Sequence, residues 1–139
     1  MQITYSYYTE DNFTSIGENE VFVFGSNLAG RHGLGAAKFA RDVCGAKYGE
    51  GHGFTGNSYA IPTKDGNLKV LSLSAIKEYI RLFQIHAAVY PDNLFLVTKV
   101  GCGLAGYKDH EVAPLFRGSP SNCKFHWTWR MYLQNPILR

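Results

Sequence analysis

The chain has 139 residues, of which 45% are hydrophobic and 18% charged, and this size predicts a single domain over residues 1–139 that buries its own core. The net charge of +3, with no basic block, argues against nucleic acid as a partner. Three cysteines without paired spacing argue against a disulfide framework, and no apolar run is as long as a membrane span, so the sequence predicts a cytoplasmic protein with no membrane partner.

Alternating or continuous apolar runs, bounded by glycine, proline or polar residues, predict five strands. In chain order these are residues 2–8, 20–24, 58–62, 94–100 and 123–127. The polar segment after the first strand is predicted to hold one short helical turn, around residues 11–15. The segment 45–56 contains five glycines and is predicted to be a loop.

Apolar residues at helical spacing predict three helices between these strands, at residues 34–44, 74–90 and 109–116. The longest helix begins at an N-cap, Ser74. Its apolar stripe consists of Ile76, Ile80, Phe83, Ala87 and Tyr90. The first helix is predicted to bury Ala36, Phe39, Ala40 and Val43. Because strands and helices alternate, the predicted fold class is α/β, a three-layer α/β/α arrangement with a mixed, mainly parallel sheet.

Two strand–glycine loop–helix units carry the functional signal. The first reads V-F-V-F-G-S-N-L-A-G-R-H-G-L-G-A-A over residues 21–37, and the second loop reads G-C-G-L-A-G-Y over residues 101–107. Unpaired backbone N–H groups in such loops and helix starts form a cradle for an anion. Ligands of open α/β sheets bind beyond the C-terminal ends of the strands, so two loops at one crevice can hold a diphosphate. The competing interpretation is that the glycines only allow tight strand-to-helix turns.

Neither loop fits the common phosphate-binding motifs. Gly25 and Gly30 have the Walker A spacing, but Arg31 and His32 stand where that motif has Lys and Ser/Thr, so no hydroxyl is placed for Mg²⁺. The dinucleotide fingerprint fails as well, because its third glycine is missing. The His, Cys and Asp residues show no metal-ligand spacing, so the sequence predicts neither a metal nor a cofactor.

Taken together, the two loops resemble the macrodomain family, the ADP-ribose-binding α/β/α modules. In that family the first binding segment is an apolar strand ending in a small-residue/Asn motif, then a glycine loop and a helix; residues 21–37 are similar to it, with Asn27 at the asparagine. The family's second loop follows a strand and reads G-x-G-x-x-G-Y or similar, as residues 101–107 do. The resemblance covers about residues 18–116, and the short chain looks like a divergent bacterial- or phage-type member.

The chain also departs from the family's pattern. Its first loop has Arg31 and His32 before the last glycines in place of an uninterrupted glycine run. The pattern does not place the acidic residue that usually selects adenine, and Asp11 is the candidate for it.

The resemblance implies a site for ADP-ribose or a related NAD-derived nucleotide. It implies that the backbone of residues 101–107 wraps the diphosphate, that Tyr107 closes over the ligand and that Asn27 places a ribose hydroxyl. Arg31 and His32 would add charge-assisted contacts to phosphate. Asn27 and His32 are the candidate catalytic residues, assisting a water held by the ligand's own phosphate. The candidate ligand-binding residues are Gly25, Ser26, Asn27, Arg31, Gly33, Gly35, Gly101, Cys102, Gly103, Leu104, Ala105, Gly106 and Tyr107.

Three kinds of function stay open at this point. An enzyme of this kind would remove ADP-ribose from a protein or nucleic acid, or a terminal phosphate from ADP-ribose phosphate. A non-catalytic module would read or sequester a nucleotide signal. A nucleic-acid-end binder would use Arg31, Lys99 and the two tryptophans, Trp127 and Trp129, which share a face if extended. Cys102 is either a nucleophile, without a histidine tied to it by sequence, or a small packing residue.

Overall fold

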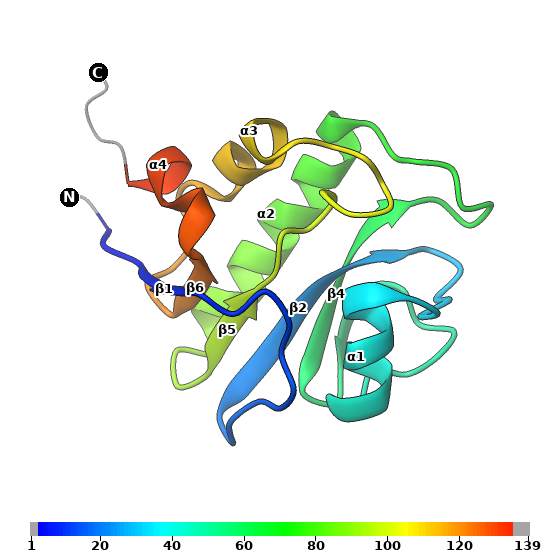
Figure 1. Cartoon of the computed structure of the whole chain (residues 1–139), viewed down its shortest axis with the longest axis horizontal. Helices are drawn as coiled ribbons and strands as arrows, with labels where there is room; N and C mark the ends of the chain where they lie inside the picture. The colour runs from blue at the N-terminus through cyan, green and yellow to red at the C-terminus, as the bar shows by residue number, and fades with distance from the viewer. Residues whose placement is uncertain (1–2, 135–139) are drawn as a thin grey trace.

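The computed structural model describes residues 3–134 and contains a six-stranded sheet between helical layers (Figure 1). The strands are β1 (Ser6–Tyr8), β2 (Glu20–Asn27), β3 (Gly53–Thr55), β4 (Ser58–Lys64), β5 (Leu94–Val97) and β6 (Cys123–His126). Their order is β1-β6-β5-β2-β4-β3, and every neighbouring pair is parallel except β3 and β4. The predicted α/β class with a mixed, mainly parallel sheet is confirmed.

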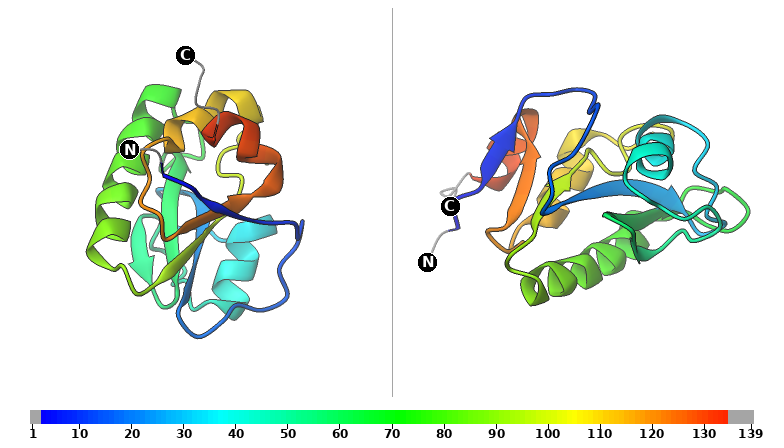
Figure 2. Two further views of the ribbon diagram at one scale, coloured as in Figure 1. Left: turned by 90° about the vertical axis from the view of Figure 1, so that its left-hand side faces the viewer. Right: turned by 90° about the horizontal axis from the view of Figure 1, so that it is seen from below.

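Helices cover both faces of this sheet. One face is covered by α1 (Gly35–Val43) and the other by α2 (Leu73–Val89), which lie on opposite sides of the strands (Figure 2). The α2 face is completed by α3 (Asp109–Val112) and a 3-10 turn over Ala113–Phe116; a second such turn, Trp127–Trp129, and α4 (Arg130–Leu133) follow β6. Within residues 3–134, every helix is too short or too polar to cross a membrane.

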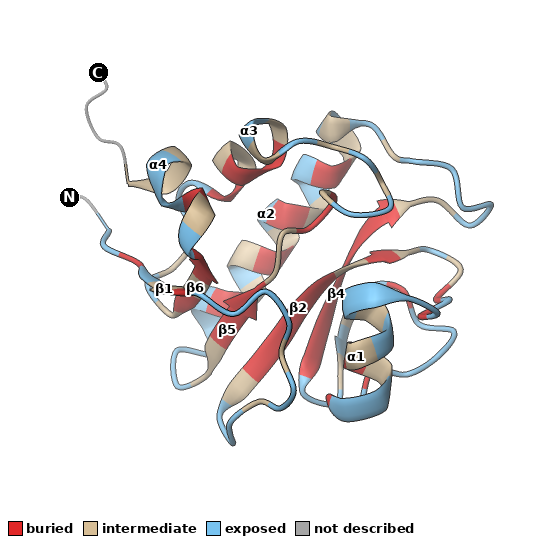
Figure 3. Cartoon of the chain, in the orientation of Figure 1, coloured by how far each residue is buried: buried red, intermediate tan, exposed pale blue. Residues whose placement is uncertain are grey.

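Two apolar clusters hold the layers together, one on each face of the sheet. Successive residues of a strand point to opposite faces; thus Val21 and Val23 pack in the cluster under α2, while Phe22 and Phe24 pack with Ala40 under α1. Most of β2 is accordingly buried (Figure 3). The predicted stripe of α2 is buried at Ile76, Ile80, Phe83 and Ala87. Tyr90, predicted to extend this stripe, is the exposed C-cap residue.

Several element boundaries differ from the prediction. The first strand is only Ser6–Tyr8, and residue 2 of the predicted strand lies outside the described residues. Residues 11–15 contain no helical turn. The second strand continues through Gly25 to Asn27, because it is hydrogen-bonded to β4 along this whole length. The long helix begins at Leu73, one residue before the predicted cap.

The ends of two helices follow from local hydrogen bonds and packing. The N-cap of α2 is Ser72, whose Oγ accepts a hydrogen bond from the Ala75 N–H at 3.2 Å. In α1, Ala36 and Val43 are exposed, contrary to the prediction. Its buried side instead consists of Ala40 and the C-cap residue Cys44, which pack on the phenylalanines of β2.

The glycine-rich segment 45–56, predicted to be a loop, contains a strand and packs against the loop that follows β2. It contains β3, which pairs antiparallel with β4. The Gly49 N–H donates to the Gly30 carbonyl at 2.8 Å, and the Ser26 hydroxyl donates to the Gly51 carbonyl. A Cβ on Gly30 or Gly51 would overlap the backbone of the facing segment. The glycines therefore permit two stretches of main chain to lie directly against each other.

This packing predicts that Gly51→Ala is strongly destabilising. The added Cβ would overlap the Asn27 carbonyl group, so the free energy of unfolding should fall by about 2 kcal/mol or more, as measured by urea denaturation. Gly66→Ala is the matched control, because a Cβ there meets open space; its change should stay within about 0.5 kcal/mol. Equal urea midpoints for the two variants would contradict the proposed close packing.

Candidate functional site

A pocket of about 800 Å³ lies along the C-terminal edge of the parallel strands. Five neighbouring strand ends border it and contribute lining residues, namely Tyr8, His126, Thr98, Ser26 and Lys64. Adjacent strands are about 4.8 Å apart, so a cleft that crosses five strand ends is about 19 Å long. The lining of the pocket therefore spans most of the sheet edge, and it lies where α/β folds usually bind their ligands.

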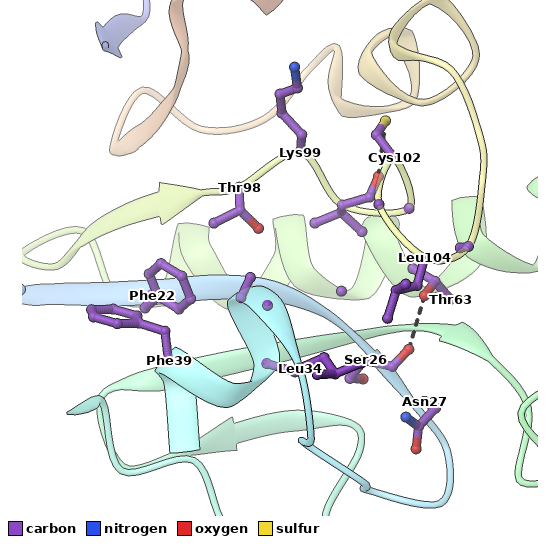
Figure 4. A pocket seen from close by; sticks show the side chains of 18 of the residues that line it. Phe22, Ser26, Asn27, Leu34, Phe39, Thr63, Thr98, Lys99, Cys102 and Leu104 are labelled. Carbon is purple, nitrogen blue, oxygen red and sulfur yellow. Dashed lines mark hydrogen bonds between the residues drawn. The ribbon is translucent and has the colours of Figure 1, made fainter. Parts of the chain in front are cut away.

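The two glycine loops form opposite walls of this pocket. Residues 33–37, at the start of α1, line one wall, and residues 101–105, after β5, line the other. Leu34 and Leu104 mark the two walls in Figure 4. Of the predicted ligand-binding residues, those that line the pocket are Gly25, Ser26, Asn27, Arg31, Gly33, Gly35, Gly101, Cys102, Gly103, Leu104 and Ala105. Gly106 and Tyr107 do not line it.

On both walls, lining residues have backbone N–H groups for which the described residues provide no acceptor. The α1 helix begins after Leu34, which has no side-chain acceptor, so the N–H groups of residues 35–37 have no acceptor among the described residues. On the other wall, the N–H groups of Gly103, Leu104 and Ala105 also have none within residues 3–134. The start of a helix and a loop with N–H groups that lack acceptors among the described residues thus line one pocket, an arrangement that favours an anion.

The second loop is held closed by its own hydrogen bonds. The Tyr107 N–H donates to the Gly101 carbonyl at 2.9 Å, and the Gly106 N–H donates to the Gly103 carbonyl at 3.0 Å. The Tyr107 hydroxyl donates to the Leu71 carbonyl at 2.5 Å, and its ring packs against the larger core cluster. Tyr107 therefore anchors the loop to the segment before α2 in this structure and does not cover the pocket.

His32, a residue of the first loop, is buried and does not line the pocket. Its side chain has 0% exposure, and its Nε2 lies 3.1 Å from the carbonyl oxygens of both Lys47 and Glu50. Two carbonyl partners require Nε2 to carry the proton. The ring also packs edge-to-face on Phe24. His32 thus fastens the glycine-rich segment to the first loop, and this placement gives it no contact with a bound ligand.

Asn27 closes the first loop through both atoms of its amide. Its Oδ1 accepts from the Arg31 N–H at 3.0 Å, and its Nδ2 donates to the Arg31 carbonyl at 3.0 Å. One N–H and one lone pair of the amide are left for another partner. Asn27 therefore has a structural role in the loop and can still contact a ligand in the pocket that it lines.

The hydroxyl groups that line the pocket all donate to main-chain carbonyls. Ser26 donates to Gly51, Thr63 to Ser26 at 3.0 Å, and Thr98 to Val23 at 2.8 Å. Each of these hydroxyls therefore offers only lone pairs to the pocket, and within residues 3–134 none is hydrogen-bonded to a histidine or carboxylate that could activate it. These side chains suit the recognition of a ligand's hydroxyl groups better than nucleophilic attack.

Cys102 lines the pocket with a thiol that resists ionisation. Burial, and then the carboxylate of Asp109, raise the pKa of Cys102 to about 12. Burial by itself would raise the pKa of Asp109 as well. The hydrogen bond that Trp129 Nε1–H donates to Asp109 at 3.0 Å, together with the charge of Lys99, instead lowers this pKa below its ordinary value. The nucleophile interpretation of Cys102 is therefore disfavoured, since the thiolate is the reactive form.

The two tryptophans would share a face only in an extended segment, and this condition is not met. They lie in a 3-10 turn rather than an extended strand, and Trp129 is fully buried while Trp127 is 55% exposed. Trp129 packs in the larger core cluster, where its ring lies against Phe116 and Phe125. A pair of stacked bases therefore has no platform here.

One end of the pocket contains Asp11, named from the sequence for the adenine-selecting position, and His126, which the sequence left unassigned. The carboxylate of Asp11 lines the pocket, and its Oδ1 lies 3.0 Å from Nε2 of His126, a buried residue at the end of β6. Nδ1 of this histidine accepts from the Thr128 N–H at 3.2 Å, so Nε2 carries the proton and donates to Asp11. Lys64 and His126 are the last residues of β4 and β6, and Thr98 directly follows β5, whereas the predicted strands ended at residues 62, 127 and 100. The error in the strand ends therefore hid these three residues.

Comparison of the chain with protein-family models, with curated proteins and with solved structures found no match in any of the three. A function for this pocket is therefore inferred from its own geometry. Within residues 3–134, that geometry combines a pocket bordered by five strand ends, two lining segments whose N–H groups lack acceptors, and a lining without an activated nucleophile.

The raised pKa values predict unreactive cysteines in the folded protein. Burial raises the pKa of Cys44 to about 11 and that of Cys123 to about 12, as for Cys102. At pH 8, iodoacetamide should alkylate Cys102 at least about 100-fold more slowly than it alkylates glutathione, as followed by peptide mass spectrometry. The unfolded chain in urea is the control and should react at the ordinary rate. Rapid labelling of folded Cys102 would restore it as a candidate nucleophile.

Proposed function

We propose that this chain binds ADP-ribose or a related NAD-derived nucleotide, as the resemblance of its two loops to the macrodomain family implies. The observation that carries this proposal is the facing pair of walls with unpaired N–H groups, at the start of α1 and at residues 103–105. A diphosphate placed between them would receive hydrogen bonds from both sides. The length and volume of the pocket fit a ligand that extends on either side of such a diphosphate.

The two ends of the pocket differ in a way that suits the two ends of such a nucleotide. Phe22 and Phe39 lie at one end and Asn27 at the other (Figure 4). Aromatic rings favour a flat base, and the free oxygen of the Asp11 carboxylate can accept a hydrogen bond from an amino group of that base. At the other end, the remaining donor and acceptor of Asn27 match a ribose hydroxyl.

The lining favours a binding module over a hydrolase. His32 is buried behind the first loop, the Cys102 thiol is protonated at neutral pH, and the lining hydroxyls are engaged with carbonyl groups. Incubation with ADP-ribosylated protein and with ADP-ribose phosphate tests this choice. We expect both ligands to be recovered unchanged. If the folded protein instead consumes them steadily, the chain is a hydrolase and not a binding module.

We expect Gly103→Val and Gly33→Val to block binding without unfolding the protein. A side chain at either position meets open space, so it would enter the pocket instead of clashing with the fold. Calorimetric titration with ADP-ribose should show a loss of affinity of more than about tenfold for both variants, because a branched side chain occupies the space that phosphate needs. Gly66→Val, which also meets open space but lies outside the pocket, is the matched control. Unchanged affinity in folded Gly103→Val would refute the proposed diphosphate position.

Asn27→Ala should lower both stability and affinity. The change removes two hydrogen bonds to Arg31 and with them the shape of the loop that leads into α1. Each lost bond costs about 1 kcal/mol, so an affinity loss of about tenfold is expected together with a lower melting temperature. Asn67→Ala, in an exposed turn, is the control. A destabilised Asn27→Ala variant with normal affinity would leave Asn27 a purely structural role.

A further inference from the structure

We propose that Leu68, at the tip of the hairpin that follows β4, is a specificity-determining residue that packs on the terminal sugar of the bound nucleotide. This inference rests on the proposed function, since it assumes that a nucleotide diphosphate occupies the middle of the pocket. Leu68 lines the pocket but belongs to neither glycine loop. It supplies an apolar contact near Asn27, where the ribose is expected to bind.

The backbone of Leu68 has an unusual conformation. Its φ is 64°, and it is the one non-glycine residue with a positive φ among residues 3–134. A leucine is disfavoured in this left-handed region because its Cβ crowds the carbonyl oxygen that follows. Three-residue hairpin loops usually have glycine at their left-handed position, yet the glycine of this loop, Gly66, does not have a positive φ. The chain therefore holds a bulky side chain at the position that suits glycine best.

Hydrogen bonds around the turn impose this conformation on Leu68. Its N–H donates to the Asp65 carbonyl at 3.0 Å, and the Asp65 N–H donates to the Lys69 carbonyl at 2.8 Å. The Asp65 carboxylate accepts from the N–H groups of Asn67 and Lys69 at 2.8 and 3.0 Å. Backbone strain persists only where surrounding contacts over-determine it, as these hydrogen bonds do here.

The hairpin is anchored next to Asn27 and to the second glycine loop. Lys64, at the start of the hairpin, is the register partner of Asn27. On the other side of the hairpin, the Leu71 carbonyl accepts a hydrogen bond from the Tyr107 hydroxyl at 2.5 Å. Strand pairing and the second loop thus together set the place from which Leu68 lines the pocket.

The core of the protein does not account for Leu68. Its side chain is 42% exposed, and it belongs to neither of the two apolar clusters formed by residues 3–134, whereas Leu71 and Leu73 pack against the larger one. Burial within the fold therefore does not offset the unfavourable backbone conformation. Burial against a bound ligand would offset it, and strained residues cluster at ligand-binding positions.

A sugar ring has the surfaces that this end of the pocket can contact. Its hydroxyl groups match the remaining donor and acceptor of the Asn27 amide, and the C–H groups on its face match an aliphatic side chain. A leucine over the ring would also exclude water and so strengthen the hydrogen bonds at Asn27. Leu68 should therefore favour ligands with a sugar beyond the diphosphate over ligands that end in the diphosphate.

The test compares ADP-ribose with ADP, which lacks the terminal ribose, by calorimetric titration of the unaltered protein and two variants. Leu68→Ala removes most of the side chain and keeps the strained conformation, whereas Leu68→Gly removes both the side chain and the strain. Both variants should bind ADP-ribose about fivefold more weakly, because the apolar contact is lost. Both should bind ADP within about twofold of the unaltered protein.

Melting temperatures separate the strain from the contact. Leu68→Gly should melt at or above the unaltered protein and about 3 °C above Leu68→Ala, because glycine adopts a positive φ without steric cost. A variant that is more stable yet binds ADP-ribose more weakly is what a residue held in place for its ligand predicts.

Val70→Ala is the matched control, because it shortens an exposed apolar side chain of the same hairpin that lies outside the pocket. It should bind both ligands as the unaltered protein does. Unchanged ADP-ribose affinity of the Leu68 variants, an equal loss of affinity for ADP, or a Leu68→Gly variant that melts below the unaltered protein would each overturn this inference and leave the proposed function intact. Binding of neither ligand by the unaltered protein would overturn both.

Discussion

The parallel pairing of β2 with β5 is the constraint on which the rest of the structure depends. The two strands are neighbours and run in the same direction, so the two glycine loops begin at adjacent points. Main-chain contact fixes this arrangement, since Thr98 donates to the Val23 carbonyl through both its N–H and its hydroxyl. A Cβ at Gly25 would lie 3.3 Å from the Gly101 nitrogen. The pocket exists because these strand ends are close and their loops diverge from them.

The glycines near the pocket serve two different physical purposes. Gly30 and Gly51 allow one backbone to lie against another, which stabilises the first loop from behind. Gly33 and Gly103 face open space, so they leave room within the pocket itself. The first two glycines thus stabilise the wall of the pocket, and the other two leave the N–H groups of the loops accessible. Only the latter pair is a direct candidate for ligand contact.

The sequence predicted the two glycine loops of the candidate site better than it predicted the positions of the polar side chains around them. Both loops were found from their strand–glycine–helix pattern, and the structure brings them to one pocket, although their roles toward a ligand stay predictions. His32 was predicted to contact phosphate, because a polar residue in a loop suggests exposure. In the structure its Nε2 is instead hydrogen-bonded to two carbonyl groups of the segment 45–56. Asp11 and His126 are 115 residues apart, and no local pattern indicates that they pair.

By itself, the sequence determined the α/β class, the two loops and the buried stripe of α2, because apolar periodicity and glycine placement are local properties of the chain. The tertiary structure alone decided which strand ends are neighbours and thereby which charges share an end of the pocket. It also decided that the segment 45–56 packs behind the first loop. These features depend on contacts between residues far apart in the chain, where strand order and close backbone approach, rather than local propensity, set the outcome.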